Sequence, residues 1–342
     1  MDGLGLKHEA IVKMDPENSS FETDAGEVYT YDWLVASPGV ELRFDRIEGS
    51  AEALADPNSP VGTIYKLEYA YKTSRLRESF KGGKAVFMLP QMPVKCGGGP
   101  QKIMYLSEET FRKNGVRDQT QIHWYTTVGV MFPNCLKYSE KLDEIRKQKQ
   151  IEAHFFHDMY KIDKDNRKAY FRDTKNGNAD VVVDYDFLHM VPPQTAPAFL
   201  KPIAAGNGFI DVDQGTLRHN KYKNIFALGD AANLPTAKTA AGVMSQAPIL
   251  VNNLIKAADE QPLNAAYDGY NSCPVFVGDD KLLLIEFKYG NVPSETFSGS
   301  WQLKPNHLFY QMKKEMFPRV YFDMMPKGRW FGKDACFKPA FV

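Results

Sequence analysis

The stretch KAVFMLPQMPVKCGGGPQKIMYLSEETFRKN, residues 84–114, decides the fold class. Its first residues, 84–90, form a strand-like apolar run, and residues 102–114 have a helix-like pattern. Three glycines at 97–99 lie between them. A strand, a glycine-rich loop and a helix in this order are typical of the loop that opens a dinucleotide-binding βαβ unit. The stretch therefore predicts an α/β fold with a parallel sheet.

The loop does not complete a dinucleotide fingerprint. That fingerprint is G-x-G-x-x-G, followed about 20 residues later by an acidic residue that holds the ribose. Gly97 and Gly99 fit its first two positions, but Lys102 stands at the third. The next expected strand, 121–127, ends without an acidic residue at its tip. The loop is therefore expected to keep the geometry of a nucleotide loop without binding a nucleotide.

The same loop surrounds a cysteine with features that favour a thiolate. Cys96 precedes the N-terminus of the expected helix, where the dipole and the free N–H groups favour an anion. Lys95 and Lys102 flank it, and nearby cations lower the pKa of a thiol. A buried structural cysteine, on a loop that uses glycine for tight turns, explains the stretch equally well. This stretch alone leaves both interpretations open.

A second motif lies at residues 224–241, NIFALGDAANLPTAKTAA. An apolar strand that ends in Gly229-Asp230 before a helix can place a carboxylate on the ribitol hydroxyls of a flavin. The plain alternative is a strand-to-helix turn in which Asp230 caps the helix. Gly-Asp after a strand is a weak signal by itself, but the Thr-Ala-Lys-Thr-Ala-Ala that follows it at 236–241 favours the flavin interpretation.

The chain has four cysteines, too few and too scattered for a disulfide scaffold, and none are paired as Cys-x-x-Cys. The sequence therefore predicts no metal site. Cys273 lies near the start of the strand-like run in YNSCPVFVG (270–278), where a Cys-Pro pair has a packing role more often than a chemical one. The sequence alone does not bring Cys273 and Cys96 together.

The composition limits the classes of function. The chain has 342 residues, of which 43% are hydrophobic and 25% charged, as in globular proteins large enough for two domains. Basic and acidic residues balance at 42 each, which gives no support to nucleic-acid binding. No apolar run reaches the roughly 18 residues that a membrane-spanning helix needs.

Strand-like and helix-like segments alternate along the chain. Residues 9–36 predict a strand meander that stops at Ser-Pro-Gly, 37–39, and residues 44–83 a partly helical connection. From residue 84 to a proline-rich break at 192–197, the pattern is that of a βαβ domain with a small antiparallel appendage. The expected elements are helices at 102–114, 137–150 and 238–258, strands at 84–90, 121–127, 151–156, 168–173 and 180–191, and a hairpin at 273–278 and 281–290.

Together these stretches resemble one family, the sulfide:quinone oxidoreductases of the eukaryotic mitochondrial type. The resemblance rests on VKCGGGPQKIMYLSEETFRK (94–113), NIFALGDAANLPTAKTAAGV (224–243) and YDGYNSCPVFVGDDKLLLIEFKYG (267–290), with MVPPQTAP (190–197) between them. The tail FYQMKKEMFPRVYFDMMPKGRWFG (309–332) is also similar to that family. The resemblance covers most of residues 9–332.

The resemblance implies the fold of the flavin disulfide reductases, with two Rossmann-like domains, FAD in the first and a second that has lost its nucleotide. The first βαβ unit of the FAD domain is expected to be absent from this chain. The expected divisions are the first part of the FAD domain at 1–83, the second Rossmann-like domain with Cys96 at 84–197, the second part of the FAD domain at 198–272, and a C-terminal region with Cys273 and an interfacial segment at 273–342.

The resemblance also implies the chemistry. Cys96 and Cys273 match the family's two redox cysteines, which face the flavin and are bridged by a disulfide or a trisulfide. Hydrogen sulfide attacks the bridge at Cys273 and leaves a persulfide there, two electrons reduce FAD, and the flavin reduces ubiquinone. The sulfane sulfur passes to a small acceptor such as glutathione or sulfite.

Further residues match FAD-binding positions of the family. Asp230, after Gly229, matches the aspartate on the FAD ribitol, and Lys238 matches a lysine near the pyrimidine edge of the flavin. Gly39 ends a Ser-Pro-Gly that matches an Ala-Thr-Gly-like stop beside the flavin, although Pro38 departs from the usual residue.

The tail at 308–331 interleaves aromatic residues and methionines with lysines and arginines, as in a segment at a membrane interface. Without the resemblance, a helix docked on the core with a basic solvent face explains it better. With it, the tail implies peripheral association with the mitochondrial inner membrane, and Lys313 is the candidate quinone-site lysine. No targeting segment is visible in the chain. Cys135 and Cys336 match no redox role and are interpreted as structural or incidental.

Other classes of function stay open on the sequence alone. A flavin-free truncated form would be a pseudoenzyme or a partner protein without activity, because the unit that holds the FAD pyrophosphate is expected to be missing. An NADH:quinone reductase of the same superfamily is disfavoured by the incomplete nucleotide loop and by Cys96 and Cys273.

Overall fold

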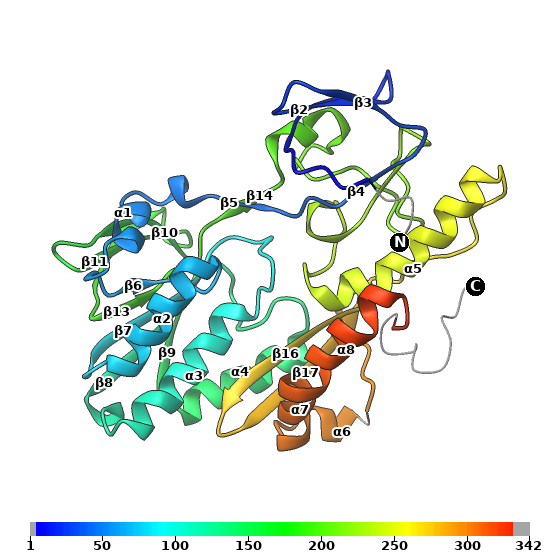
Figure 1. Ribbon diagram of the computed structural model, residues 1–342. Helices are drawn as coiled ribbons and strands as arrows, with labels where there is room; N and C mark the ends of the chain where they lie inside the picture. The colour runs from blue at the N-terminus through cyan, green and yellow to red at the C-terminus, as the bar shows by residue number, and fades with distance from the viewer. Residues whose placement is uncertain (1–4, 298, 331–342) are drawn as a thin grey trace.

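A five-stranded parallel sheet is built around the apolar run that follows Gly83 (Figure 1). The computed structural model describes residues 5–297 and 299–330, and the strand order of this sheet is β6-β13-β7-β8-β9. Residues 85–89 of β7 are fully buried, as in a parallel strand covered on both faces. The strands are β6 (Val61–Gly62), β13 (Phe187–His189), β7 (Gly83–Leu89), β8 (Thr120–Thr126) and β9 (Ile151–Phe155).

Helices complete the βα pattern of this part. α3 begins at Gly99, inside the glycine run, and contacts β7. It also contacts β16 of the C-terminal hairpin, so one helix joins two parts of the molecule. The predicted α/β class with a parallel sheet is confirmed. The helices are α1 (Ser50–Ala55), α2 (Leu67–Ser79), α3 (Gly99–Lys113) and α4 (Leu136–Gln148).

Two segments of this part differ from the expectation. Residues 44–83, expected as a connection, supply α1, β6 and α2, and Ile47 and Val61 lie in the same buried core as β7. The expected strand at 180–191 is two strands in different sheets, β12 (Ala179–Asp184) and β13. The domain boundaries stay predictions, and the packing of β6 and α2 favours an earlier start for the second domain than the one expected.

The antiparallel appendage contains one strand, β10, that the sequence does not indicate. β10 (His157–Asp163) pairs with β11 (Lys168–Asp173), and β11 pairs with β12. The register of β10 shifts between Met159 and Lys161. Such an irregularity breaks the two-residue alternation of buried positions by which a strand is recognised, so β10 was missed.

The part above the sheet in Figure 1 holds the meander and the Gly-Asp motif. β1, β2 and β3 form an antiparallel sheet, and β15 pairs in parallel with β4. The chain crosses between the two parts along β5 and β14, which pair antiparallel. The bounds are β1 (Ile11–Asp15), β2 (Ser20–Thr23), β3 (Val28–Thr30), β4 (Leu34–Ala36), β5 (Glu41–Leu42), β14 (Gln194–Thr195), β15 (Ile225–Ala227) and α5 (Ala240–Ala258).

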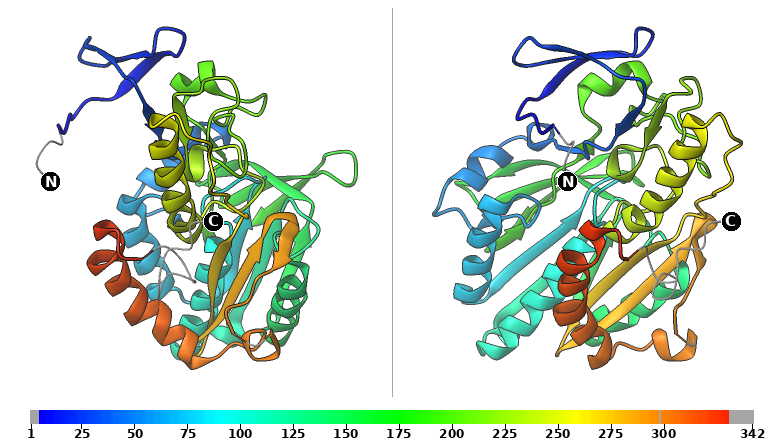
Figure 2. Two further views of the ribbon diagram at one scale, coloured as in Figure 1. Left: turned by 90° about the vertical axis from the view of Figure 1, so that its right-hand side faces the viewer. Right: turned by 45° about the vertical axis from the view of Figure 1, so that its right-hand side comes forward.

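A β-hairpin and a helical run form the C-terminal region. β16 and β17 pair antiparallel, and α7 packs on β17 (Figure 2). No helix in residues 5–297 and 299–330 is long and apolar enough to cross a membrane. The bounds are β16 (Asn271–Gly278), β17 (Lys281–Lys288), β18 (Val292–Pro293), α6 (Gly299–Gln302), α7 (His307–Gln311), a π-turn (Met312–Met316) and α8 (Phe317–Asp323). Short 3-10 turns are at Phe44–Arg46, Arg117–Gln119, Ala198–Ile203, Gly229–Ala231, Tyr289–Asn291 and Met325–Lys327.

A buried carboxylate ties this hairpin to the segment that follows it. Glu286 of β17 accepts hydrogen bonds from the hydroxyl of Tyr270 and from the side-chain amide of Gln302 (2.8 Å). It also accepts them from the N–H (2.8 Å) and the hydroxyl (2.7 Å) of Thr296. Glu286→Ala removes the buried acceptor of these four hydrogen bonds, so the free energy of unfolding is expected to fall by about 3 kcal/mol in urea denaturation. A loss no larger than that of the exposed control Glu140→Ala would contradict this role.

Candidate active site

Cys96 lies where the glycine loop meets α3, in a left-handed backbone conformation (φ 52°). Its N–H donates to the carbonyl of Lys238 (2.8 Å), and its carbonyl accepts from the N–H of Gly99 (2.6 Å). The same carbonyl accepts from the hydroxyl of Tyr65 (3.0 Å). A non-glycine residue in this conformation costs about 1–3 kcal/mol, which the surrounding structure must offset. These three hydrogen bonds hold the conformation and fix the direction of the thiol.

Cys273 reaches the same place from the hairpin. It is buried, and its sulfur lies so close to Gly98 that a Cβ atom on that glycine would stand 2.4 Å from it. A Cβ atom on Gly99 would stand 3.7 Å from the sulfur of Cys96. The structure therefore brings the two predicted redox cysteines together over consecutive glycines, which leave room for both sulfur atoms.

A lysine of α3 lies beside the cysteine pair. Lys102 donates to the sulfur of Cys96 (3.3 Å). A hydrogen bond with Cys273 and the positive charge of Lys102 hold the pKa of Cys96 well below that of a free thiol, although burial opposes them. The same hydrogen bond and burial raise the pKa of Cys273. The reduced pair therefore holds a thiolate at Cys96 and a thiol at Cys273.

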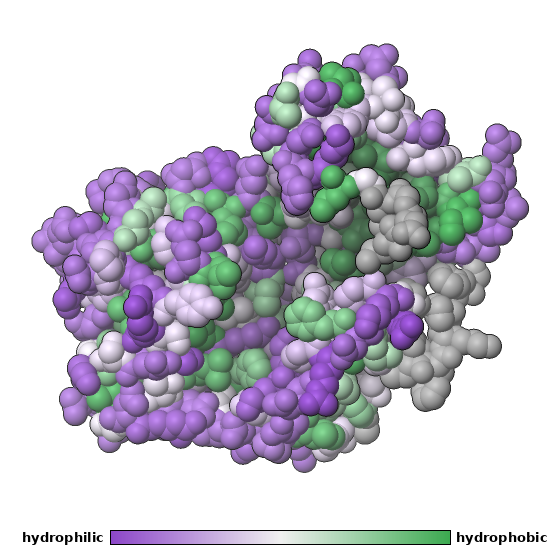
Figure 3. All heavy atoms as spheres, viewed as in Figure 1, coloured by the Kyte–Doolittle hydropathy of each residue, from purple (hydrophilic) through white to green (hydrophobic). Residues whose placement is uncertain are grey.

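A cavity of about 630 Å³ opens beside Cys96, within the size range of cofactor sites. The four residues predicted to bind FAD all line it: Gly39, Gly229, Asp230 and Lys238. In the view of Figure 3, hydrophobic atoms line the hollow between the part that holds β1–β3 and the part below it. Groups from three distant segments of the chain thus face one space.

The cavity wall fits the flavin that the sequence predicts. Thr239, which lines the cavity, caps α5 by accepting a hydrogen bond from the N–H of Gly242 (3.2 Å), so the positive end of α5 faces the cavity. Gly229 turns the chain at φ 77°, and its N–H donates to Gln246 (2.8 Å). A helix N-terminus beside a glycine turn suits the electron-rich edge of a flavin ring.

Lys238 adds a buried positive charge to this wall. Its ammonium donates to the carbonyls of Asp230 (2.5 Å) and Ala232 (3.3 Å) and lies 4.2 Å from the ring centre of Phe209. Burial lowers the pKa of Lys238 to about 8, against the Asp230 carboxylate, so the lysine stays mostly charged at neutral pH. Burial raises the pKa of Asp230, while Lys238 and Lys95 lower it.

Lys313 of the π-turn lies within electrostatic reach of the cysteine pair. Burial and then the charge of Lys102 lower its pKa, whereas Cys96 and Cys273 raise it. π-turns inside helices are frequent at functional sites. The predicted quinone role of Lys313 stays a prediction, for a lysine whose charge interacts with the cysteine pair.

One residue of the site was not predicted from the sequence. Two further cysteines, outside the site, were predicted to have no redox role. Tyr65 carried no motif, yet its ring lines the cavity and its hydroxyl holds Cys96. Cys135, interpreted as structural, is buried directly before α4, where burial raises its pKa. Cys336 lies outside the described residues.

Lys102→Gln is expected to raise the pKa of Cys96, because the substitution removes the cation that bonds the sulfur. The pH profile of Cys96 alkylation by iodoacetamide should move upward by about one to two pH units. Lys95→Gln is the control, since Lys95 makes no hydrogen bond to the sulfur among the described residues. An unchanged profile in Lys102→Gln, or equal shifts in both variants, would contradict the assignment.

Comparisons with known proteins agree with this site. No family model matches the chain. The mitochondrial sulfide:quinone oxidoreductase of Dictyostelium discoideum is 42% identical over 335 residues, which are 97% of this chain and 73% of that protein. The mitochondrial sulfide:quinone oxidoreductase of Mus musculus is 37% identical over 342 residues, covering 99% of this chain and 74% of that protein.

Solved structures agree on the fold. The sulfide:quinone oxidoreductase of the bacterium Aquifex aeolicus superposes with a TM-score of 0.72 at 18% identity, covering 92% of this chain and 74% of that chain. A chain in the Tetrahymena thermophila mitochondrial ATP synthase structure superposes with a TM-score of 0.82 at 26% identity, covering 95% of this chain and 80% of that chain. The resemblance read from the cysteine and Gly-Asp motifs is confirmed: the chain belongs to the mitochondrial sulfide:quinone oxidoreductases, a family of FAD-dependent oxidoreductases with the flavin disulfide reductase fold.

Proposed function

We propose that this chain oxidises hydrogen sulfide at Cys96 and Cys273 and passes the electrons through FAD to ubiquinone in the mitochondrion. One observation carries the proposal: the two cysteines meet beside Lys102 at the edge of the cavity that Asp230 and Lys238 line. A thiolate held by a cation next to a cofactor-sized cavity is the arrangement that sulfur-to-cofactor electron transfer needs.

The proposed cycle begins with a disulfide between Cys96 and Cys273. Hydrosulfide attacks the sulfur of Cys273, the S–S bond breaks, Cys273 becomes a persulfide and Cys96 leaves as a thiolate. Lys102 stabilises that thiolate through its hydrogen bond to the sulfur. Of two thiols in a disulfide, the one with the lower pKa leaves faster, so the depressed pKa of Cys96 directs the attack to Cys273.

The persulfide then gives up its outer sulfur. A small nucleophile such as glutathione or sulfite attacks that sulfur, the S–S bond breaks, and Cys273 is left as a thiol. Two electrons and the thiol proton must leave the pair to restore the disulfide. FAD supplies the two-electron acceptor when it is bound. Lys238 and the N-terminus of α5 offer positive charge where electrons arrive.

The tail is the proposed contact with the quinone and the membrane. Leu308, Met316, Tyr321 and Phe322 are exposed on the run from α7 to α8, beside lysines and arginines. Apolar and aromatic side chains next to basic ones are the composition of a helix that lies in the headgroup region. We assign this run to peripheral association with the mitochondrial inner membrane, with Lys313 on its inner side.

The test is sulfide-dependent reduction of a short-chain ubiquinone analogue by the purified chain supplied with FAD, with sulfite or glutathione as the sulfur acceptor. Quinol formation that requires sulfide and one of the two acceptors is expected. Reduction that runs on NADH instead of sulfide, or none with either acceptor, would overturn the proposal.

A further inference from the structure

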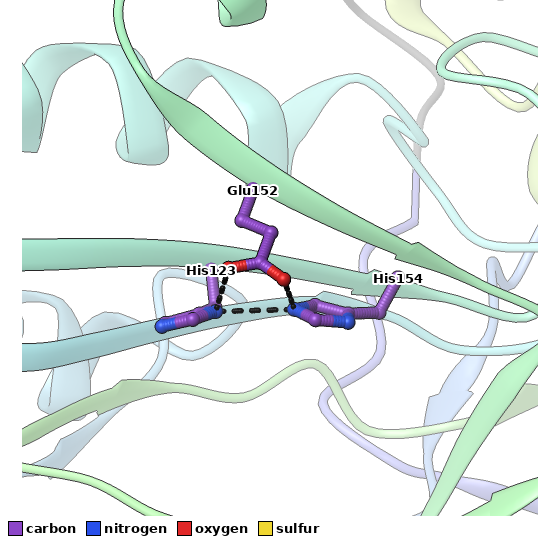
Figure 4. A group of neighbouring side chains, drawn as sticks. All are labelled: His123, Glu152 and His154. Carbon is purple, nitrogen blue, oxygen red and sulfur yellow. Dashed lines mark hydrogen bonds and ion pairs between the residues drawn. The ribbon is translucent and has the colours of Figure 1, made fainter.

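A second group of ionisable side chains lies on the five-stranded sheet, apart from the cysteine site. β8 and β9 are neighbouring parallel strands, and Glu152 is the register partner of His123. His154 follows Glu152 by two residues, so both side chains point to the same face of the sheet. Figure 4 shows the polar ends of the three side chains converging. None of them lines the cavity beside Cys96.

One possible ligand atom from each of the three side chains lies within 4.8 Å of the other two. Nδ1 of His123 lies 3.1 Å from Nε2 of His154. The two carboxylate oxygens of Glu152 lie 3.5 Å from Nδ1 of His123 and 3.6 Å from Nε2 of His154. Ligand atoms bound at ~2.0–2.1 Å to a tetrahedral metal lie ~3.3 Å from each other. The contact between the two nitrogens, and that of each nitrogen with its own carboxylate oxygen of Glu152, are within a few tenths of an ångström of this spacing.

Hydrogen bonds among the three side chains cannot satisfy all of their facing atoms. If His123 donates through Nδ1 to His154, then Nε2 of His154 carries no proton and presents a lone pair to the Glu152 carboxylate. The reverse tautomers leave the same conflict at His123. A cation between the three side chains satisfies these acceptors at once.

The surroundings suit a metal ion with one open position. The ring of Tyr125 stacks on His154 with centroids 4.2 Å apart and restrains that ring. Glu152 has 65% of its side chain exposed, against 24% for His154 and 12% for His123. The two imidazoles are therefore held in place by the sheet while the carboxylate edge opens to water.

We propose that His123, Glu152 and His154 bind a divalent metal ion of the zinc type, with water in the fourth position, and that this ion joins β8 to β9. Two imidazoles and one carboxylate are a ligand set that zinc accepts. Cysteine spacing predicted no metal site, whereas these ligands lie on two strands that only the fold makes neighbours.

Cobalt(II) titration of the purified chain tests the proposal, because cobalt replaces zinc and reports its ligands by absorption. One equivalent is expected to give visible d–d bands that zinc abolishes. Cobalt held by Cys96 and Cys273 instead would show an intense near-ultraviolet sulfur band, so the two sites are told apart in one spectrum. His154→Gln and the more exposed Glu152→Gln are each expected to weaken binding about tenfold or more.

His307→Gln is the matched control, since His307 lies on α7 and is exposed. It should keep the cobalt bands, and circular dichroism should show that every variant is folded. The proposal is overturned if the chain gives only the sulfur band, or if Glu152→Gln and His154→Gln bind cobalt as tightly as the unchanged chain.

Discussion

Cys273→Ser is expected to lower the sulfide-dependent rate of quinone reduction by about a thousandfold or more. The reason is chemical: hydrosulfide attacks a disulfide sulfur, and a serine cannot form that disulfide with Cys96. The side chain itself is nearly isosteric with cysteine, so the hairpin that carries it should fold. The measurement is the initial rate of quinol formation at saturating sulfide, with FAD supplied.

Cys135→Ser is the matched control for this substitution. Cys135 is as fully buried as Cys273 but lies directly before α4 and does not line the cavity. It should keep the sulfide-dependent rate within about threefold, even if burial of a hydroxyl lowers the stability. A control variant as inactive as Cys273→Ser, or an active Cys273→Ser, would contradict the assigned chemistry.

Gly98→Ala is expected to lower the same rate by about a hundredfold while the protein stays folded. The backbone of Gly98 (φ −82°, ψ −4°) suits alanine, so the substitution adds no conformational strain. The new Cβ atom would stand 2.4 Å from the sulfur of Cys273. Because real atoms do not approach so closely, Cys273 must move away from Cys96, and the two sulfur atoms lose the geometry of a disulfide.

Gly97→Ala controls for the loss of a glycine from the same loop. Its Cβ atom would stand 3.1 Å from the end of the Met92 side chain, which is flexible enough to yield. This variant should keep most of the activity. Equal losses in both variants would mean that loop flexibility, and not the approach of Gly98 to Cys273, controls the rate.

The strand, the glycine loop and the helix at 84–114 could be predicted from the sequence, because the patterns that indicate them are local. The run 84–90, the glycines and the helix after them appear as β7 (Gly83–Leu89) and α3 (Gly99–Lys113), within three residues of the expected bounds. The hairpin at 273–290 and the helix at 238–258 also appear near their expected positions. In each case the buried pattern and the turn residues lie within one short window.

The missed elements depend on contacts that no short window contains. β6 (Val61–Gly62) has only two residues and becomes a strand because β13 lies beside it. β10 is hidden by its register shift. Local periodicity cannot reveal an element whose partner is more than a hundred residues away along the chain, as for β6 and β13.

In the candidate site too, contacts between residues near in sequence could be anticipated, and contacts between distant residues could not. The neighbours of Cys96 in sequence, Lys102 among them, made a thiolate one of two open interpretations, and Lys102 does bond the sulfur. The meeting of Cys96 with Cys273 was implied by the resemblance alone, since nothing in the residues determines it. Tyr65 could not be inferred, because its hydroxyl reaches Cys96 only through the packing of the segment before α2.

Electron transfer from sulfide through the cysteine pair to a bound flavin is tested most directly by a visible spectrum of the purified chain with FAD, before and after anaerobic addition of sulfide. The chain is expected to retain the flavin, and sulfide is expected to bleach its visible absorption or to produce a long-wavelength charge-transfer band from the Cys96 thiolate to the flavin. A protein that retains no flavin, or a flavin spectrum that sulfide leaves unchanged, would contradict this electron transfer.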